Sequence, residues 1–449
     1  MKKLLSLLTV GALLLGLGGC SQTGTAKTEK DNKQQTVVFW HSLSGALGDE
    51  LNAVVKEYNE SRGKKQGVKV DAVFQGYKGT DKVVLAYQTK DKENACDINV
   101  GLVSTIPSML ALKWTQPVEE LLQKDHSTIK KEDYYPALLR AVTYNKKMIA
   151  VPFLNSTMEM YCNLDALKEA GIKEVPNNFS DLLPLLPKLV KKSDQGISRY
   201  GLECQVKRYQ LVNFIVSQHK DAFFGDQEGG RAGEMTKLIC GEDGTLDKFL
   251  DQWEKLLKTG AYQPVENKLT EEFAAGKTAL AIMSSSKVGS VQSLVKDKFK
   301  WSTVPFPKIN KEDTSGAAVG GSCLVLFNRG NEKRMMAAWD FMQYLSSPEV
   351  QSRIVKKSGY LPTTTGTEKQ ADLQKFYQEN PNYKTALDIM KTSDPLSQEP
   401  MDLTYNEINK VITTAMENFC SGKLTKEETK NKIITESNKL LNDWHAANG

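Results

Sequence analysis

Small hydroxyl side chains and aromatic rings stand at the ends of several short apolar runs in this sequence. Trp40, His41 and Ser42 come at the end of the first run. Ser284 and Ser285 come at the end of a later one. Aromatic rings stack on the C–H faces of polyhydroxylated molecules, while neutral hydroxyl groups hydrogen-bond to their hydroxyls. These residue types therefore favour recognition of a small polar molecule.

Each of these residues also has a purely structural interpretation. A tryptophan in an apolar run is often buried in the core, and His41 is placed to cap the helix that follows. Ser284 is a good helix N-cap. Gly320 and Gly321 allow backbone amides to approach a ligand closely, but they are equally typical of a tight turn. Both interpretations stay open at this point.

Motifs typical of catalytic and metal sites are absent from the 449 residues. No G-x-S-x-G, H-E-x-x-H, P-loop or C-x-x-C motif occurs, and the four histidines are not paired at metal-ligand spacing. A glycoside hydrolase needs two carboxylates across the scissile bond, and we expect no acidic residue in an apolar, pocket-like setting. The sequence therefore predicts a protein that is not an enzyme and holds no cofactor or metal.

The elements that must position the polar residues alternate between strand and helix in the first part of the chain. Period-2 and continuous apolar runs predict strands at 36–40, 68–74 and 97–100, and helical spacing predicts helices at 48–60, 80–88 and 106–112. A further helical segment is expected at 118–122. Strand–helix alternation is typical of parallel βαβ units, so the fold class is α/β.

The middle and end of the chain are richer in helices. We predict strands at 148–153, with Pro152 inside it, at 276–283 after a turn, and at 322–327. The expected helices are 164–170, 179–192, 246–258, 271–275, 333–345, 402–419 and 426–444.

The N-terminus has the pattern of an export signal. Lys2 and Lys3 precede an apolar run from 4 to 17, which is too short to span a bilayer comfortably. The run ends in Leu17-Gly18-Gly19-Cys20, which resembles a lipobox, although an ordinary secretory signal with a chance cysteine is the alternative. We predict a signal peptide over 1–20, lipidation of Cys20, and a disordered polar linker over 21–35.

The charge and the cysteine content bear on the possible partners and on the redox state of the protein. The net charge of +5 is mild and Lys and Glu are interleaved, so no nucleic-acid partner is expected. Six cysteines besides Cys20 are widely spaced, and both disulfides and buried free thiols are compatible with their positions. They are Cys96, Cys162, Cys204, Cys240, Cys323 and Cys420.

A series of short motifs resembles the extracellular solute-binding proteins of ABC importers (family 1), in particular their sugar-binding and glycerol-3-phosphate-binding members. The motifs occur in the family's order along nearly the whole chain after residue 36. They are Phe39-Trp-His-Ser42, Tyr77-Lys-Gly79, Pro152-Phe-Leu-Asn-Ser-Thr157, Tyr161-Cys-Asn-Leu-Asp165, Gly276-Lys running into Ser284-Ser285, Gly320-Gly321, the helix Ala337–Leu345 and Gly359-Tyr-Leu-Pro362.

The resemblance implies a two-lobed periplasmic-binding-protein-like fold (type II), with the ligand in a cleft between lobes joined by crossing segments. Residues 36–150 with about 285–345 are expected to form the N-terminal lobe. Residues 151–284 with about 346–449 are expected to form the C-terminal lobe, so that the chain crosses near Val151, near Ser284 and after Leu345.

The resemblance also assigns ligand residues. Tyr77, Ser156 and Tyr360 match family ligand positions, Asn155 lies beside Ser156, and Tyr209 aligns loosely with a cleft tryptophan of the family. Two family positions differ here. Where glycerol-3-phosphate binders carry an acidic residue this chain has Leu102, and their phosphate-binding Arg falls near Met401-Asp402, with no Arg nearby in the sequence. Since a phosphomonoester favours Arg, the second difference favours a neutral sugar or a glycerophosphodiester.

We therefore expect the substrate-binding lipoprotein of an ABC importer, a monomer anchored on the outer face of the cell membrane. It captures a sugar or oligosaccharide and delivers it to permease subunits. The alternative is binding of glycerol-3-phosphate, a glycerophosphodiester or another polyol. More remote alternatives are a surface sensor or adhesin and a secreted glycoside-processing enzyme.

Overall fold

The computed structural model describes residues 34–448 except residue 125. The predicted signal peptide, Cys20 and most of the predicted linker lie outside the described residues. Within the described part, no helix combines the length and apolar character needed to span a bilayer.

Three parallel strands confirm the predicted βαβ start of the chain. β1 (Gln35–His41) pairs in parallel with β2 (Val68–Phe74) on one side and with β3 (Ile98–Leu102) on the other. The connecting helices are α1 (Gly45–Glu60), α2 (Arg62–Gln66) and α3 (Gly79–Gln88). α1 buries Leu51, Val54 and Tyr58, at the helical spacing that the sequence predicts for a core-facing stripe.

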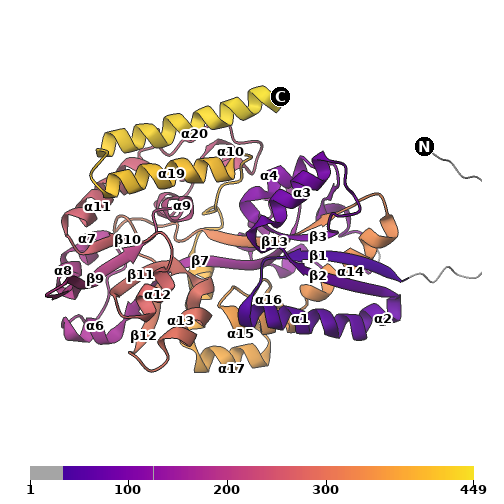
Figure 1. The fold of residues 1–449 in the computed structure, drawn as a ribbon, viewed down its shortest axis with the longest axis horizontal. Coiled ribbons are helices and arrows are strands. Elements are labelled where there is room, and N and C mark those ends of the chain that lie inside the picture. The colour runs from indigo at the N-terminus through magenta and orange to yellow at the C-terminus, as the bar shows by residue number, and fades with distance from the viewer. Residues whose placement is uncertain (1–33, 125, 449) are drawn as a thin grey trace, which may run out of the picture.

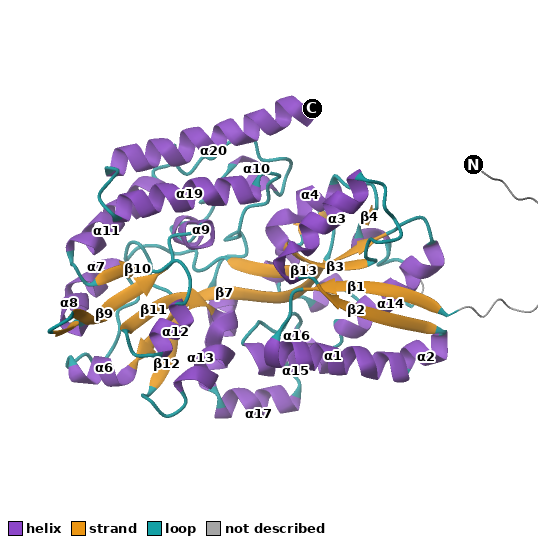
Figure 2. Cartoon of the chain, viewed as in Figure 1, coloured by secondary structure: helices purple, strands orange, loops and turns teal. Residues whose placement is uncertain are grey.

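A single long strand, β7 (Val151–Asn163), links the two halves of the molecule (Figure 2), and all 13 of its residues are buried. Its first part pairs with β13 (Val319–Phe327), and its second part pairs with β11 (Thr278–Ser284) and β12 (Trp301–Pro305), always antiparallel. The whole sheet therefore runs β10-β9-β11-β7-β13-β3-β1-β2 without a break.

The second half of the sheet is built on β9 (Gly196–Cys204), which pairs in parallel with β10 (Tyr262–Pro264) and β11. Figure 1 shows helices α9 (Arg208–Val216), α11 (Thr245–Lys258), α19 (Tyr405–Cys420) and α20 (Lys426–Asn448) covering one face of this half. α20 packs along α19, so the end of the chain covers the second half of the molecule.

The other elements are short or lie at the periphery. The helices are α4 (Ile106–Leu110), α5 (Pro136–Ala141), α6 (Leu164–Glu169), α7 (Phe179–Leu182), α8 (Leu186–Leu189), α10 (Asp226–Gly230), α12 (Leu269–Ala274), α13 (Val288–Val295), α14 (Glu332–Leu345), α15 (Pro348–Ser358), α16 (Thr365–Glu368), α17 (Ala371–Glu379) and α18 (Thr385–Thr392). The strands are β4 (Thr115–Gln116), β5 (Thr143–Tyr144), β6 (Lys147–Met148) and β8 (Lys191–Ser193).

The buried apolar residues form two clusters, which we call the first and the second core, and the first core extends to Phe273 of α12 and Met283 of β11. One contains Phe39, Tyr58 and Trp339, the last on α14. The other contains Phe214 and Trp253, whose rings lie 5.6 Å apart. We call the part built on β1, β2 and β3 the first lobe and the part built on β9, β10 and β11 the second lobe. The lobe boundaries given in residue numbers above stay predictions.

Three predicted elements differ from the structure. The helix expected over 179–192 is broken into α7, a 3-10 turn, α8 and β8, because Pro184 and Pro187 interrupt its hydrogen bonding. Residues 118–122 form only a 3-10 turn over Val118–Glu120. The strand expected at 148–153 instead begins at Val151 and continues to Asn163.

Candidate ligand-binding site

The two strands that link the lobes are locally distorted where they cross from one lobe to the other. The register of β13 against β7 shifts between Gly321 and Ser322. Gly321 has φ +104°, and a Cβ atom there would collide with the carbonyl oxygen of Leu154, which itself has φ +57°. Only glycine tolerates the Gly321 conformation without strain. Gly320 and Gly321 therefore lie inside a strand and not in a tight turn.

Serine hydroxyls from two strands meet beside this distortion. The Ser284 hydroxyl donates to the Ser156 hydroxyl at 3.0 Å, joining the end of β11 to β7. The Ser284 hydroxyl oxygen also accepts a 3.3 Å hydrogen bond from the Ser286 backbone N–H. Ser284 thus caps the 3-10 turn Ser285–Lys287, as its structural interpretation predicted, and holds Ser156 at the same time.

Three of the predicted ligand residues carry buried polar atoms that lack a well-formed hydrogen bond among the described residues. They are Asn155 through Oδ1, Ser285 through Oγ and Tyr209 through its hydroxyl. The Asn155 amide donates to the Gly320 carbonyl at 3.3 Å, and the Tyr209 ring lies against Gly320. Because buried polar atoms without partners are costly, these three atoms are candidates to contact a bound molecule.

The Gly-Tyr-Leu-Pro segment adjoins the same place. The Leu361 backbone N–H donates to the Asn155 carbonyl at 2.8 Å. Gly359 has φ +85° and packs against the Ser285 carbonyl, 2.6 Å from where a Cβ atom would stand. Tyr360 is therefore held next to Asn155 and Ser285, and its contact with a ligand stays a prediction.

The predicted residues from the first strand are not joined to this group. Trp40 is buried in the first core. The His41 ring lies between Phe39 and Phe74, its Nδ1 accepts a 3.3 Å hydrogen bond from Leu43, and burial lowers its pKa. Ser42 is half-buried. Among the described residues, no hydrogen bond connects these three to the serines of β7 and β11.

Tyr77 is the remaining predicted ligand residue. Its backbone lies in the 3-10 turn Gly76–Lys78, between β2 and α3. Its side chain lies outside the described part of the structure, so its role stays a prediction.

A buried ion pair beside Tyr209 was not found by sequence reasoning. Arg208 and Asp402 are both fully buried, and the Arg208 Nη2 donates to the Asp402 carboxylate at 2.5 Å. The guanidinium also donates to the Pro400 carbonyl at 3.2 Å and lies 4.5 Å from the centre of the Tyr405 ring. The pair therefore ties α9 to the segment that precedes α19.

A second arginine approaches the same segment from α10. The residues labelled α10 form a left-handed turn with positive φ from Gln227 to Gly230, and the Met401 backbone N–H donates to the Gly229 carbonyl at 2.9 Å. Arg231 directly follows this turn. The sequence has no Arg near Met401-Asp402, but tertiary contacts bring Arg208 and Arg231 to this segment.

Glu399 connects this charged group to the distorted strands. One of its carboxylate oxygens lies 3.1 Å from where a Cβ of Gly320 would stand. Burial raises the pKa of Glu399 to about 7, against the opposing influence of Arg208 and Arg231. Burial also raises the pKa of Glu203, to about 8, and that of Glu159. The expectation that no carboxyl group stands in an apolar setting is therefore wrong.

A cavity of about 520 Å³ lies between the lobes near these residues. Thr80 and Thr105 line it from the first lobe, and Tyr405 and Glu407 line it from α19. The lobes touch beside it, where the Asp402 backbone N–H donates to the Ser104 carbonyl at 3.3 Å. This cavity has the size of a small-molecule site.

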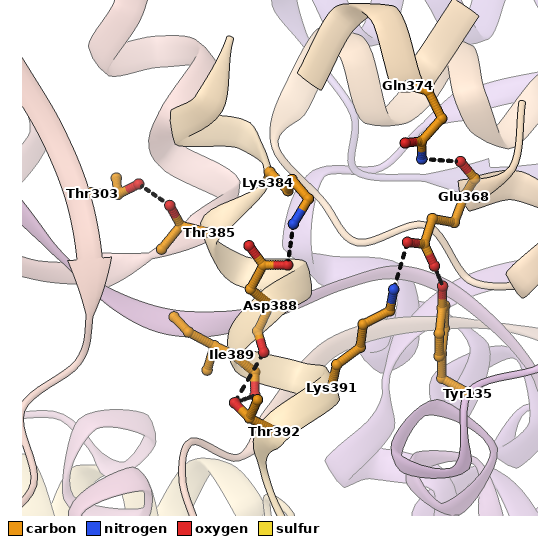
Figure 3. Close-up of polar contacts among 10 residues, drawn as sticks. All are labelled: Tyr135, Thr303, Glu368, Gln374, Lys384, Thr385, Asp388, Ile389, Lys391 and Thr392. Carbon is orange, nitrogen blue, oxygen red and sulfur yellow. Dashed lines mark hydrogen bonds and ion pairs between the residues drawn. The ribbon is translucent and has the colours of Figure 1, made fainter. Parts of the chain in front are cut away.

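Another cavity, of about 590 Å³, lies within the second lobe between β12 and α18. Figure 3 shows that polar side chains along it already have partners: Thr385 with Thr303 at 2.8 Å, and Asp388 with Lys384. Because its polar groups are satisfied within the protein, this cavity is a weaker ligand candidate than the group around Asn155 and Tyr209.

Two lobes linked by distorted strands that carry unsatisfied polar atoms define a two-lobed ligand-binding protein. The comparison with known proteins agrees: the profile of the family "Bacterial extracellular solute-binding protein" matches residues 53–385. The chain belongs to this family, as the motifs in the sequence predicted. Proteins of this class bind small ligands outside the cytoplasm and deliver them to ABC permeases.

Curated relatives align over nearly the full length. The sn-glycerol-3-phosphate-binding periplasmic protein UgpB of Escherichia coli (strain K12) is 24% identical over 451 residues, covering 96% of this chain and 97% of the relative. UgpB of Shigella dysenteriae is 25% identical over 456 residues, covering 96% and 97%.

Solved structures confirm the two-lobed α/β fold. UgpB from Mycobacterium tuberculosis, in complex with glycerophosphocholine, has a TM-score of 0.74 at 17% identity, covering 92% of this chain and 99% of that one. The sugar-binding protein MalE from Xanthomonas citri also scores 0.74, at 19% identity, covering 92% and 100%. The Listeria monocytogenes protein Lmo0181, in complex with cycloalternan, scores 0.72 at 15% identity, covering 93% and 100%.

Proposed function

We propose that this protein captures an extracellular carbohydrate between its lobes and delivers it to the permease of an ABC importer without altering it. The main support is the set of buried neutral polar atoms on Asn155, Tyr209 and Ser285 that make no well-formed hydrogen bond among the described residues. Neutral donors and acceptors are what sugar hydroxyls require. Several relatives of the same fold bind sugars, including maltose and cycloalternan.

The setting of the protein is part of the same proposal. The lipobox at Leu17–Cys20 supports a lipid anchor at Cys20, which keeps a monomeric binding protein at the outer face of the cell membrane. The polar stretch 21–35 would then space the lobes from the bilayer. No step of this function makes or breaks a bond in the ligand, so we propose no enzymatic activity.

One observation favours a second candidate function, binding of glycerol-3-phosphate or a glycerophosphodiester. The structure brings Arg208 and Arg231 beside Met401, the position where the family resemblance places a phosphate-binding Arg. Relatives named for glycerol-3-phosphate or crystallised with glycerophosphocholine support the same candidate.

The test is calorimetry and thermal shift with neutral sugars on the wild type and on Tyr209→Phe. The Tyr209 hydroxyl has no well-formed hydrogen bond in the protein, so removing it costs little stability. We expect Tyr209→Phe to keep its thermal midpoint and to bind the sugar about 5- to 10-fold more weakly.

Tyr377→Phe is the matched control. Tyr377 is also buried, its hydroxyl also lacks a partner among the described residues, and it lies on α17, away from the linking strands. Equal affinities for Tyr209→Phe and the wild type would remove Tyr209 from the site. The absence of binding by any mono- or oligosaccharide would contradict the carbohydrate function.

A further inference from the structure

The guanidinium group of Arg231 is buried without acceptors for most of its donors. Arg231 is 4% exposed, and its Nε donates to the Arg140 carbonyl at a long 3.4 Å. Among the described residues, no acceptor meets either Nη1 or Nη2 of Arg231. The Nε of Arg140, on α5, is likewise buried and unpartnered. Three guanidinium nitrogen atoms therefore lie close together without acceptors among the described residues.

The neighbouring acidic groups are already paired with another arginine or only partly ionised at neutral pH. Glu228 pairs with Arg140 at 2.5 Å, and Asp402 pairs with Arg208. Glu399 lies within electrostatic range of Arg231, but no hydrogen bond joins them, and burial holds the pKa of Glu399 near 7. The positive charge of Arg231 therefore has no paired carboxylate among the described residues.

Burial and the like charge of Arg140 lower the pKa of Arg231 to about 9. The group is thus still protonated at neutral pH, and a buried cation without a partner is destabilising. Such a cost persists in proteins where it serves binding, because a site built for a ligand is rarely optimal for stability.

Arg231 also lies close to the candidate ligand residues, in a segment where the two lobes are near each other. It follows the turn that holds Met401, and its carbonyl accepts a 2.8 Å hydrogen bond from the Asn145 backbone N–H. Arg140 comes from α5, which packs on β7 and β13, whereas Arg231 comes from the second lobe. Glu399 interacts electrostatically with Arg231, and its carboxylate lies beside Gly320, which the Tyr209 ring also contacts.

We propose that Arg231, assisted by Arg140, binds an anionic group of the ligand, either a phosphate ester or a carboxylate carried by a sugar or polyol. This inference rests on the proposed function and narrows its ligand class to anionic carbohydrates and polyols. A guanidinium donates two parallel hydrogen bonds to a phosphate or carboxylate, which matches the two unpartnered Nη atoms. The anion also relieves the repulsion between Arg140 and Arg231 and so favours the closed arrangement of the lobes.

The experiment compares Arg231→Met with the wild type by calorimetry and thermal shift on the full chain. The probes are glycerol-3-phosphate and glycerophosphocholine for phosphate, glucuronate for carboxylate, and maltose as a neutral sugar. We expect Arg231→Met to bind the anionic probe about 30-fold or more weakly. Its ligand-free thermal midpoint should rise, because the substitution removes an unbalanced buried charge. Arg231→Lys should restore part of the affinity.

Arg199→Met is the control, since Arg199 pairs with Glu169 at 2.7 Å and makes no contact with this group. It should leave anion affinity unchanged. Which probe binds the wild type decides between phosphate and carboxylate.

Three outcomes would overturn the inference. The first is a wild type that binds none of the anionic probes. The second is unchanged anion affinity in Arg231→Met. The third is a lower midpoint for Arg231→Met together with equal losses for maltose and the anions, since that is the result of a structural role. If one of the first two outcomes occurs while maltose binds strongly, the carbohydrate function stays intact and only the anion site is removed.

Discussion

The Arg208–Asp402 pair supplies a quantitative test of the packing beneath the ligand site. In Arg208→Met, the Asp402 carboxylate loses its cationic partner inside a fully buried environment. Breaking a buried pair on one side costs roughly 3–5 kcal/mol. Asp402 keeps a 3.0 Å hydrogen bond from the Thr404 backbone N–H, so we expect about 3–4 kcal/mol.

The double variant Arg208→Met/Asp402→Asn separates charge from packing. With no charge left, the remaining loss is of hydrogen bonds and of contact with Tyr405, about 1–2 kcal/mol. The double variant should therefore be more stable than Arg208→Met alone, by about 2 kcal/mol. Such a reversal is the signature of an uncompensated buried charge.

The assay is urea unfolding followed by tryptophan fluorescence, to which Trp253 in the second core contributes. Arg353→Met serves as the partly exposed control. Its side chain is 32% exposed and that of its partner Glu57 is 56% exposed, so its loss should be about 1 kcal/mol. If Arg208→Met costs less than the control, or if the double variant is less stable than Arg208→Met, the assignment of a strongly coupled buried pair is refuted.

Three further predictions follow from burial and close packing. Gly320→Ala places a Cβ 2.6 Å from the Tyr209 ring, so urea unfolding should show a loss of about 1–3 kcal/mol, and an unchanged midpoint would contradict this contact. The pKa of Glu399 is about 7 when folded and about 4.5 when unfolded, so the unfolded chain loses its proton first as the pH rises. Stability should then fall by up to about 3 kcal/mol between pH 4.5 and 7, and Glu399→Gln should flatten that part of the urea-midpoint profile, whereas an unchanged slope would sink the assignment. In thiol labelling of the native protein read by mass spectrometry, the buried cysteines should react only after unfolding, and rapid native labelling would show that they are accessible; they are Cys96, Cys162, Cys204, Cys240 and Cys323.

The local pattern of the sequence was sufficient for part of the regular elements. α1, α3, α11 and α14 lie close to where helical apolar spacing placed them, because that spacing directly reports a buried helix face. The sequence pattern gave wrong bounds where pairing between distant segments determines the extent of a strand. β7 is continuous through Pro152, which pairs with Cys323 of β13, and neither segment shows this pairing by itself.

The candidate site was predicted in part for the same reason. Asn155, Ser156 and Ser284 stand beside recognisable strands, so their grouping could be expected. Arg208 and Arg231 carry no local signal, since their neighbours at Pro400 and Met401 are distant in sequence. Trp40 and His41 have residue types suited to ligands, but apolar packing around β1 buries them in the first lobe.

The position of β13 in the chain has a consequence for how the protein acquires its structure. β13 is the antiparallel neighbour of β3, yet it is translated only after the strands of the second lobe. Until then β3 presents an unpaired edge, which is a site of aggregation and proteolysis. The first lobe cannot complete its sheet as an autonomous N-terminal unit, and its closure spans a long loop that slows folding. Chains truncated before Val319 should therefore be aggregation-prone substrates of chaperones and proteases rather than stable half-proteins.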